Sequence, residues 1–153
     1  TFNLRDIASV VQGLLSANTK ETADPADFIR LWVHENLRVF RDRLVNTDDR
    51  QWFDGQLKAI VPKHFGTPWE DVVTVEVTHL IYGDFMDPNA DPKLYTEITD
   101  TTKMVSTVEE YLEDYNATAK TKMPRRTVLL RPRFLRHVSM ALVASTARTS
   151  AIF

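Results

Sequence analysis

Apolar residues recur every three or four positions in three stretches of the first half of the chain, which is the spacing of amphipathic α-helices. The longest stretch, Asp24 to Leu44, predicts one long helix in which Asp24 caps the first turn and Pro25 takes the first helical position. The other two stretches predict helices over residues 3–15 and from Thr47 to Gly66. Short polar segments join them, so the pattern predicts a small helical bundle.

The first two predicted helices each have an apolar face. On the long helix this face consists of Phe28, Leu31, Trp32, Val39, Phe40 and Leu44. On the first helix it consists of Leu4, Ile7, Ala8, Val11, Leu14 and Leu15. Glu35 and Arg38 fall mostly outside the apolar face of the long helix, and we expect them on its polar side. A Gly inside a helix costs about 1 kcal/mol relative to Ala, so Gly13 favours close packing at that position.

After Gly66 the pattern becomes mixed. Residues 67–70 predict a capping box that opens a short helix, and alternation over 73–78 predicts a short strand. Residues 80–86 are mostly apolar, and 87–92 have the composition of a turn. A last long helix is predicted over 102–116. The fold class is therefore mainly α, a small helical bundle followed by a linker with a short strand and a further long helix.

Composition and charge change this picture at the C-terminal end. The chain has no Cys, so disulfides and thiol chemistry are excluded, and no apolar run approaches the roughly 20 residues of a membrane span. Residues 1–114 hold all 21 acidic residues and 11 of the 19 basic ones, a net charge of −10, whereas the remainder has only basic charges. We place a boundary near Lys120 and leave residues 123–153 as a basic tail of unassigned structure.

The sequence offers little catalytic chemistry. It contains no Gly-rich phosphate loop, and its four His lack the spacing of metal ligands, so neither a metal site nor a catalytic residue is predicted. The paired carboxylates near residue 110 indicate a solvated helix face. The basic tail has few aromatic residues between its charges, so nucleic acid is not the expected partner.

One cation has an unusual position. Asn3 and Asp6 predict a capping box at the start of the first helix, with Asp6 in the place usually taken by Glu or Gln. Arg5 lies in that first turn, where a positive charge opposes the helix dipole. It either pairs with Asp6, Asp42 or solvent, or reaches a phosphate bound elsewhere, which a guanidinium contacts well.

Several long strings resemble the dynein heavy chain. They are FNLRD at 2–6, IRLWVHENLRVFRDRLV at 29–45, WFDGQL at 52–57, LIYGDFMDPNADPKLY at 80–95 and VEEYLEDYN at 108–116. They match the segment where the third AAA+ module ends and the fourth begins, and they look more like an axonemal than a cytoplasmic heavy chain. The resemblance covers roughly residues 1–122.

The resemblance implies a domain organisation and a site. Residues 1–65 would be the helical lid of the third module, and residues 66–122 the linker and first helix of the fourth. In AAA+ lids, an arginine called sensor 2 reaches the nucleotide of the preceding large domain, and Arg5 is the matching position. Leu80, Ile81 and Tyr82 lie where AAA+ modules line an adenine pocket, although packing explains them equally well.

The resemblance also implies partners and a location. The parent protein would be an ATP-driven microtubule motor that binds ATP and ADP. It would contact neighbouring AAA+ modules, dynein intermediate and light chains, and microtubules in a ciliary or flagellar axoneme, with no membrane partner. The chain itself lacks a phosphate loop, so we expect neither a cofactor nor ATPase activity from it alone.

From Pro124 onward the sequence does not match the family, which continues there with an apolar helix and a phosphate loop. A truncated or misread gene would explain both this mismatch and the change in charge. Two other functions remain open. The chain could be a non-enzymatic helical interaction module, or its tail could bind nucleic acid nonspecifically through charge.

Overall fold

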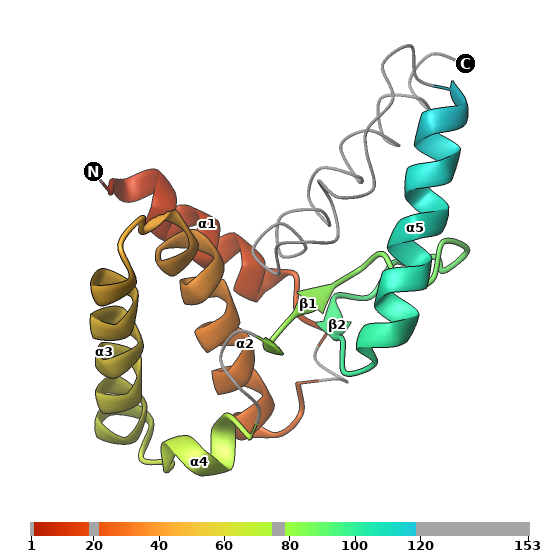
Figure 1. Ribbon diagram of the computed structural model, residues 1–153. Helices are drawn as coiled ribbons and strands as arrows, with labels where there is room; N and C mark the ends of the chain where they lie inside the picture. The colour runs from red at the N-terminus through yellow and green to blue at the C-terminus, as the bar shows by residue number, and fades with distance from the viewer. Residues whose placement is uncertain (1, 19–21, 75–78, 119–153) are drawn as a thin grey trace.

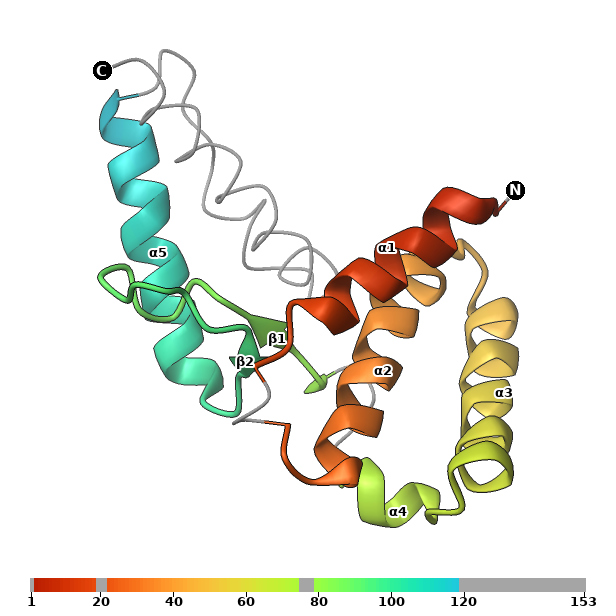
Figure 2. The same ribbon diagram turned by 180° about the vertical axis from the view of Figure 1, so that it is seen from behind.

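The computed structural model describes residues 2–18, 22–74 and 79–118 (Figure 1). Helices α1 (Leu4–Leu15), α2 (Pro25–Val39) and α3 (Thr47–Phe65) form the predicted bundle. α2 lies between α1 and α3 in both views (Figures 1 and 2) and contacts each of them. The described part of the chain is mainly α-helical, which confirms the predicted fold class.

The second half is built around a two-stranded antiparallel sheet. β1 (Tyr82–Gly83) pairs with β2 (Thr96–Glu97), with Tyr82 opposite Glu97. The last described helix, α5 (Thr101–Thr118), follows β2 directly and extends away from the bundle (Figure 2). The sheet lies between α5 and the bundle in both views.

The long helix begins as predicted and ends earlier. The Asp24 side chain accepts a hydrogen bond from the Ala26 backbone N–H at 3.0 Å, and Pro25 occupies the first helical position. The helix ends at Val39 rather than Leu44, and a short 3-10 helix, η1 (Arg41–Arg43), follows. Arg41 donates to the Asp54 carboxylate of α3 at 2.6 and 2.8 Å, and this pair holds the turn that brings α3 back along α2.

α2 is buried on more than one face. Its buried side chains are Ile29, Leu31, Val33, His34, Glu35, Leu37, Arg38 and Val39. The expectation that Glu35 and Arg38 lie on a polar side is wrong, because Glu35 is fully buried and Arg38 is only 7% exposed. Phe28, assigned to the apolar face, is instead 41% exposed. Packing against α1, α3 and α4 (Trp69–Val72) surrounds this helix, so no single face defines its burial.

α1 has the opposite arrangement. Its apolar positions Leu4 and Leu15 are 83% and 81% exposed, and Ile7 and Val11 are about half exposed. The buried residues of the helix are Val10 and Gly13. Gly13 meets Glu35 of α2 so closely that a Cβ at this position would overlap the Glu35 carboxylate. The close packing predicted from Gly13 is confirmed, and it turns the apolar face of α1 away from the bundle.

The segment from α3 to the sheet departs from prediction at one point, the start of α4. α3 continues through Pro62 to Phe65 and ends where Gly66 adopts a left-handed conformation with φ 71°. The capping box at Thr67 is wrong, because α4 (Trp69–Val72) begins after Pro68 without a side-chain cap. The strand expected over 73–78 lies largely outside the described residues, which stop at 74 and resume at 79.

Two groups of buried apolar residues hold the described part of the chain together. The larger one joins α2, α3, α4 and the residues around β1: Ile29, Leu31, Val33, Leu37, Leu57, Val61, Trp69, Val72, Val73, Leu80 and Tyr82. The smaller one lies against α5: Ile81, Phe85, Ile98, Met104 and Val108. The predicted basic tail, residues 123–153, lies outside the described residues.

The Gly13 contact yields a first prediction. Gly13→Ala places a methyl group on the buried Glu35 carboxylate and should lower the free energy of unfolding by about 1–3 kcal/mol, the usual cost of overpacking. Gly55→Ala is the matched control, because Gly55 lies in α3 and nothing stands within 4 Å of the place its new methyl group would take. It should be neutral or stabilising by up to about 1 kcal/mol through helix propensity. Urea denaturation of both variants checks this, and equal stability would contradict it.

Candidate functional site

The cap of α1 fixes the position of Arg5. The Asn3 side chain accepts from the Arg5 backbone N–H at 2.9 Å, and the Asn3 backbone N–H donates to Asp6 Oδ2 at 2.7 Å. The predicted capping box is thus present. Asp6 also forms an ion pair with Arg43, the last residue of η1. The first turn is therefore tied to the corner between α2 and α3.

Arg5 itself is exposed on this cap. Within the described ranges its guanidinium makes no hydrogen bond or ion pair. Asp6, one of the anions proposed for it, is held by the Asn3 N–H and by Arg43. Arg5 is therefore available to an anion from outside the described part of the chain.

Asp6 stays charged to a lower pH than an ordinary aspartate. The hydrogen bond from the Asn3 backbone is the main cause of its lowered pKa, and the bond and charge of Arg43 act in the same direction. Arg43 also lies over the Phe2 ring at 5.0 Å, and Phe2 makes an edge-on contact with Phe40. These contacts keep the N-terminus of α1 in place beside Arg5.

The residues proposed for an adenine wall separate into two groups. Leu80 and Tyr82 are packed in the larger apolar group, whereas Ile81 belongs to the smaller one. Successive side chains of an extended chain point to opposite sides, which explains the division. Of the three, Ile81 alone lines the pocket described next.

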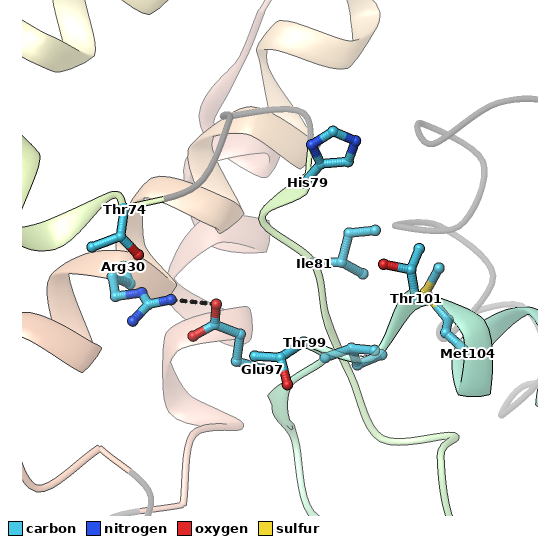
Figure 3. A pocket seen from close by; sticks show the side chains of 9 residues that line it. Arg30, Thr74, His79, Ile81, Glu97, Thr99, Thr101 and Met104 are labelled. Atoms are coloured by element: carbon cyan, nitrogen blue, oxygen red, sulfur yellow. Dashed lines mark hydrogen bonds and ion pairs between the residues drawn. The ribbon is translucent and has the colours of Figure 1, made fainter.

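A pocket of about 520 Å³ lies between α2, the sheet and the start of α5 (Figure 3). It is lined by Arg30, Thr74, His79, Ile81, Glu97, Ile98, Thr99, Thr101 and Met104. Arg30 and Glu97 form an ion pair on one side, and Ile81, Thr101 and Met104 lie together on the other (Figure 3). The pocket therefore has an apolar wall facing a charged one.

This arrangement suits a flat, largely apolar group with a polar edge, because ligand pockets combine apolar walls with a few placed polar groups. The Nε atom of Arg30 is buried and has no hydrogen-bond partner in the described structure, so one donor at the charged wall is unused. Nothing in the sequence pattern pointed to Arg30 or Glu97. They are 67 residues apart and meet only through the fold.

Two kinds of site are not found in the described part of the chain. Its His, Asp and Glu residues do not form a group of three that could hold a metal ion. None of its helices combines the length and apolar character needed to cross a membrane.

The comparisons with known proteins agree with this architecture. Residues 1–75, which contain α1 to α4, match the AAA+ lid domain family. The chain is 48% identical over 125 residues to dynein axonemal heavy chain 1 of Mus musculus, and 38% identical over 136 residues to dynein axonemal heavy chain 12 of Homo sapiens. The chain belongs to the dynein heavy chain family. Each match uses 80% of this chain but only 3% or 4% of the relative, so this dynein heavy-chain sequence corresponds to a short segment of such proteins.

The Asp6 contacts generate a second prediction. The pKa of Asp6 is lowered in the folded segment, so its contribution to stability is present above the unfolded value of about 3.9 and is lost as pH falls through the folded value. Asp6→Asn should keep an acceptor for the Asn3 N–H but lose the charge. The variant should therefore show a smaller fall in melting temperature between pH 6 and pH 2 than the wild type.

Glu113→Gln is the control for this experiment, because Glu113 is exposed on α5. It should leave the acid dependence unchanged. If Asp6→Asn follows the wild-type acid curve as closely as this control does, the Asp6 charge has no role in stability.

Proposed function

We propose that this dynein heavy-chain segment forms part of an AAA+ ring. Residues 1–65 act as the helical lid of the third module, and residues 66–122 as the linker and first helix of the fourth. The parent protein is an ATP-driven microtubule motor of the ciliary or flagellar axoneme. The identity to axonemal heavy chains over 80% of the chain supports this proposal.

In this function Arg5 acts as the nucleotide sensor of the lid. The support is its place in the first turn of α1, beside a cap that Asp6 and Arg43 hold rigid, with its guanidinium unengaged by the described residues. An arginine is suited to this role because its planar fork can donate two parallel hydrogen bonds to phosphate oxygens. The nucleotide would be ATP or ADP bound by the preceding large domain.

Ile81 forms the adenine wall together with Ile98 and Met104. These three apolar side chains share one side of the pocket, and the other side has the polar groups that an adenine edge requires. Leu80 and Tyr82 support the wall from the apolar group behind it. The nucleotide phosphates would be held by parts of the heavy chain outside this segment.

The exposed face of α1 also fits a place in a ring. Leu4, Ile7, Val11 and Leu15 leave an apolar stripe uncovered within the described structure. Contiguous exposed apolar surface marks contact sites, and in the motor a neighbouring AAA+ module would cover it. Intermediate chains, light chains and microtubules would be partners through the parent protein only.

The same stripe favours a second candidate, a non-enzymatic helical interaction module that acts without a motor. A cooperative melt of a soluble monomer would favour the module. Aggregation that stops when Ile7 and Val11 are both changed to Ser would favour the ring segment. In that case the neighbouring domains that cover the stripe in the ring would be absent from the isolated chain.

The sensor role predicts a loss of nucleotide affinity. Residues 1–122 are placed in a dynein axonemal heavy chain in exchange for the matching segment, and binding of ATP to the third module is measured. Arg5→Ala should weaken it by about 10- to 100-fold, the usual value of a lost charge-assisted hydrogen bond. Lys58→Ala is the control, since Lys58 is an exposed residue of α3. Equal affinities in the two variants would remove Arg5 from the nucleotide site.

The adenine wall predicts a specific photolabelling pattern. In the same exchanged heavy chain, 8-azido-ATP should label the peptide that contains Ile81 or the one that contains Met104. Thr101→Trp should suppress this labelling because Thr101 lines the pocket, whereas Thr102→Trp should not, because Thr102 is exposed and outside it. Undiminished labelling in Thr101→Trp would place the adenine elsewhere.

A further inference from the structure

A chain of polar contacts runs through the interior beside Gly13 and is separate from the proposed nucleotide site. His34 Nδ1 lies 3.0 Å from the Leu80 carbonyl oxygen, and His34 Nε2 lies 3.2 Å from the Tyr95 hydroxyl. The Tyr95 hydroxyl donates to Glu35 Oε1 at 2.7 Å. Arg38 donates to the other oxygen of Glu35 at 2.6 and 3.0 Å. His34 and Glu35 have no exposed surface.

The contacts need more protons than the ordinary charge states supply. A carbonyl only accepts, so the contact with Leu80 requires a proton on Nδ1 of His34. The His34–Tyr95 contact and the Tyr95–Glu35 contact require one proton each. A neutral imidazole and a phenol provide one proton apiece, which leaves one of the three contacts without a proton. Either an imidazolium at His34 or a carboxylic acid at Glu35 completes the set.

The phenol cannot relieve this shortage by changing its own state. Burial is the main cause of the raised pKa of Tyr95, and the charge of Glu35 and the hydrogen bond to it raise the pKa further. Tyr95 therefore keeps its single proton, which can be shared with only one neighbour at a time. Without a further proton, two lone pairs would face each other in the interior, where an unmet hydrogen bond is costly.

The charges around the chain accommodate one additional proton. From α2, Arg38 already pairs with the Glu35 carboxylate, and α1 contributes the backbone of Gly13 and the Ser9 carbonyl there. From β1, the Tyr82 ring lies 5.2 Å from His34, and its own raised pKa keeps it uncharged.

Asp84, which follows β1, acts electrostatically on Tyr95, and its Oδ1 is buried without a hydrogen-bond partner in the described structure. Glu97 and Arg30 next to Tyr82 form their own ion pair. With the extra proton the group of His34, Glu35 and Arg38 has one net positive charge, which the Asp84 carboxylate offsets.

We propose that the buried His34–Tyr95–Glu35 chain holds one shared extra proton at neutral pH and acts as a proton-dependent lock between the lid helices and the segment from Leu80 to Tyr95. The lock joins α2, which contains His34 and Glu35, to Leu80, which precedes β1, and to Tyr95, which precedes β2. Loss of the proton leaves one contact of the lock without a hydrogen bond, and the attachment of this segment weakens. This proposal does not depend on nucleotide binding.

The direction of the pH effect follows from where the proton is bound. In the unfolded chain, His and Glu have pKa values of about 6.5 and 4.3, so above about pH 6.5 folding takes up the proton. The stability that the bound proton contributes is therefore fully present below about pH 6.5. It falls as pH rises above this value, until the folded chain also releases the proton. One proton changes the unfolding equilibrium constant by at most about tenfold per pH unit.

Nuclear magnetic resonance of the 153-residue chain at pH 7 decides the proposal. The chain is labelled uniformly with ¹⁵N and ¹³C, and the side-chain signals of His34 and Glu35 are assigned through bonds to the backbone of the wild-type chain. We expect either two protonated ring nitrogens at His34 or a protonated carboxyl at Glu35. A neutral ring at His34 together with an ionised Glu35 would overturn the proposal, even if every variant failed to fold.

A pair of variants tests the lock itself. Tyr95→Phe removes only the bridging hydroxyl and should abolish the decrease in stability between pH 6.5 and pH 8.5. His64→Gln should keep that decrease, because His64 is an exposed residue near the end of α3. A wild-type chain with no such decrease, or a decrease that survives in Tyr95→Phe, would contradict the lock.

Discussion

The fold depends on one buried carboxylate. Glu35 lies in the C-terminal half of α2, against the backbone of Gly13, and is satisfied by Arg38 on one oxygen and Tyr95 on the other. A carboxyl group in the interior is tolerated only when its oxygens are hydrogen-bonded and any charge on it is paired. Each partner therefore has its position dictated by Glu35: α1 must present a residue without a side chain, and the segment before β2 must deliver a hydroxyl.

This constraint also explains why the two halves of the described chain form one structure. Tyr95 and the Leu80 carbonyl approach α2 from the second half, and their contacts with Glu35 and His34 bracket the short sheet. Leu80 and Tyr82 then pack on the bundle, while Ile81 is left facing α5. The pocket arises from this alternation, because its apolar wall is the side of the segment that the bundle does not use.

Family membership gives a meaning to the surface that the bundle leaves uncovered. An apolar stripe on α1 is costly for an isolated domain, and natural soluble chains rarely expose such surface without a partner. The Gly13–Glu35 contact orients the stripe outward, and the capping box holds its N-terminal end with Arg5 exposed. In the proposed ring function, this one helix would supply both a surface for a neighbouring module and a cation for the nucleotide.

The local elements could be predicted from the amino-acid order alone. Asp24 and Pro25 set the start of α2, the capping box sets the start of α1, and Gly66 sets the end of α3, since each depends on neighbouring backbone groups only. The long strings of family residues were likewise sufficient for membership. The burial of Glu35 and Arg38, and the meeting of Arg30 with Glu97, emerged only from the packed chain. These outcomes depend on which helices pack around α2, and periodicity along one helix has no information about partners that are distant in the sequence.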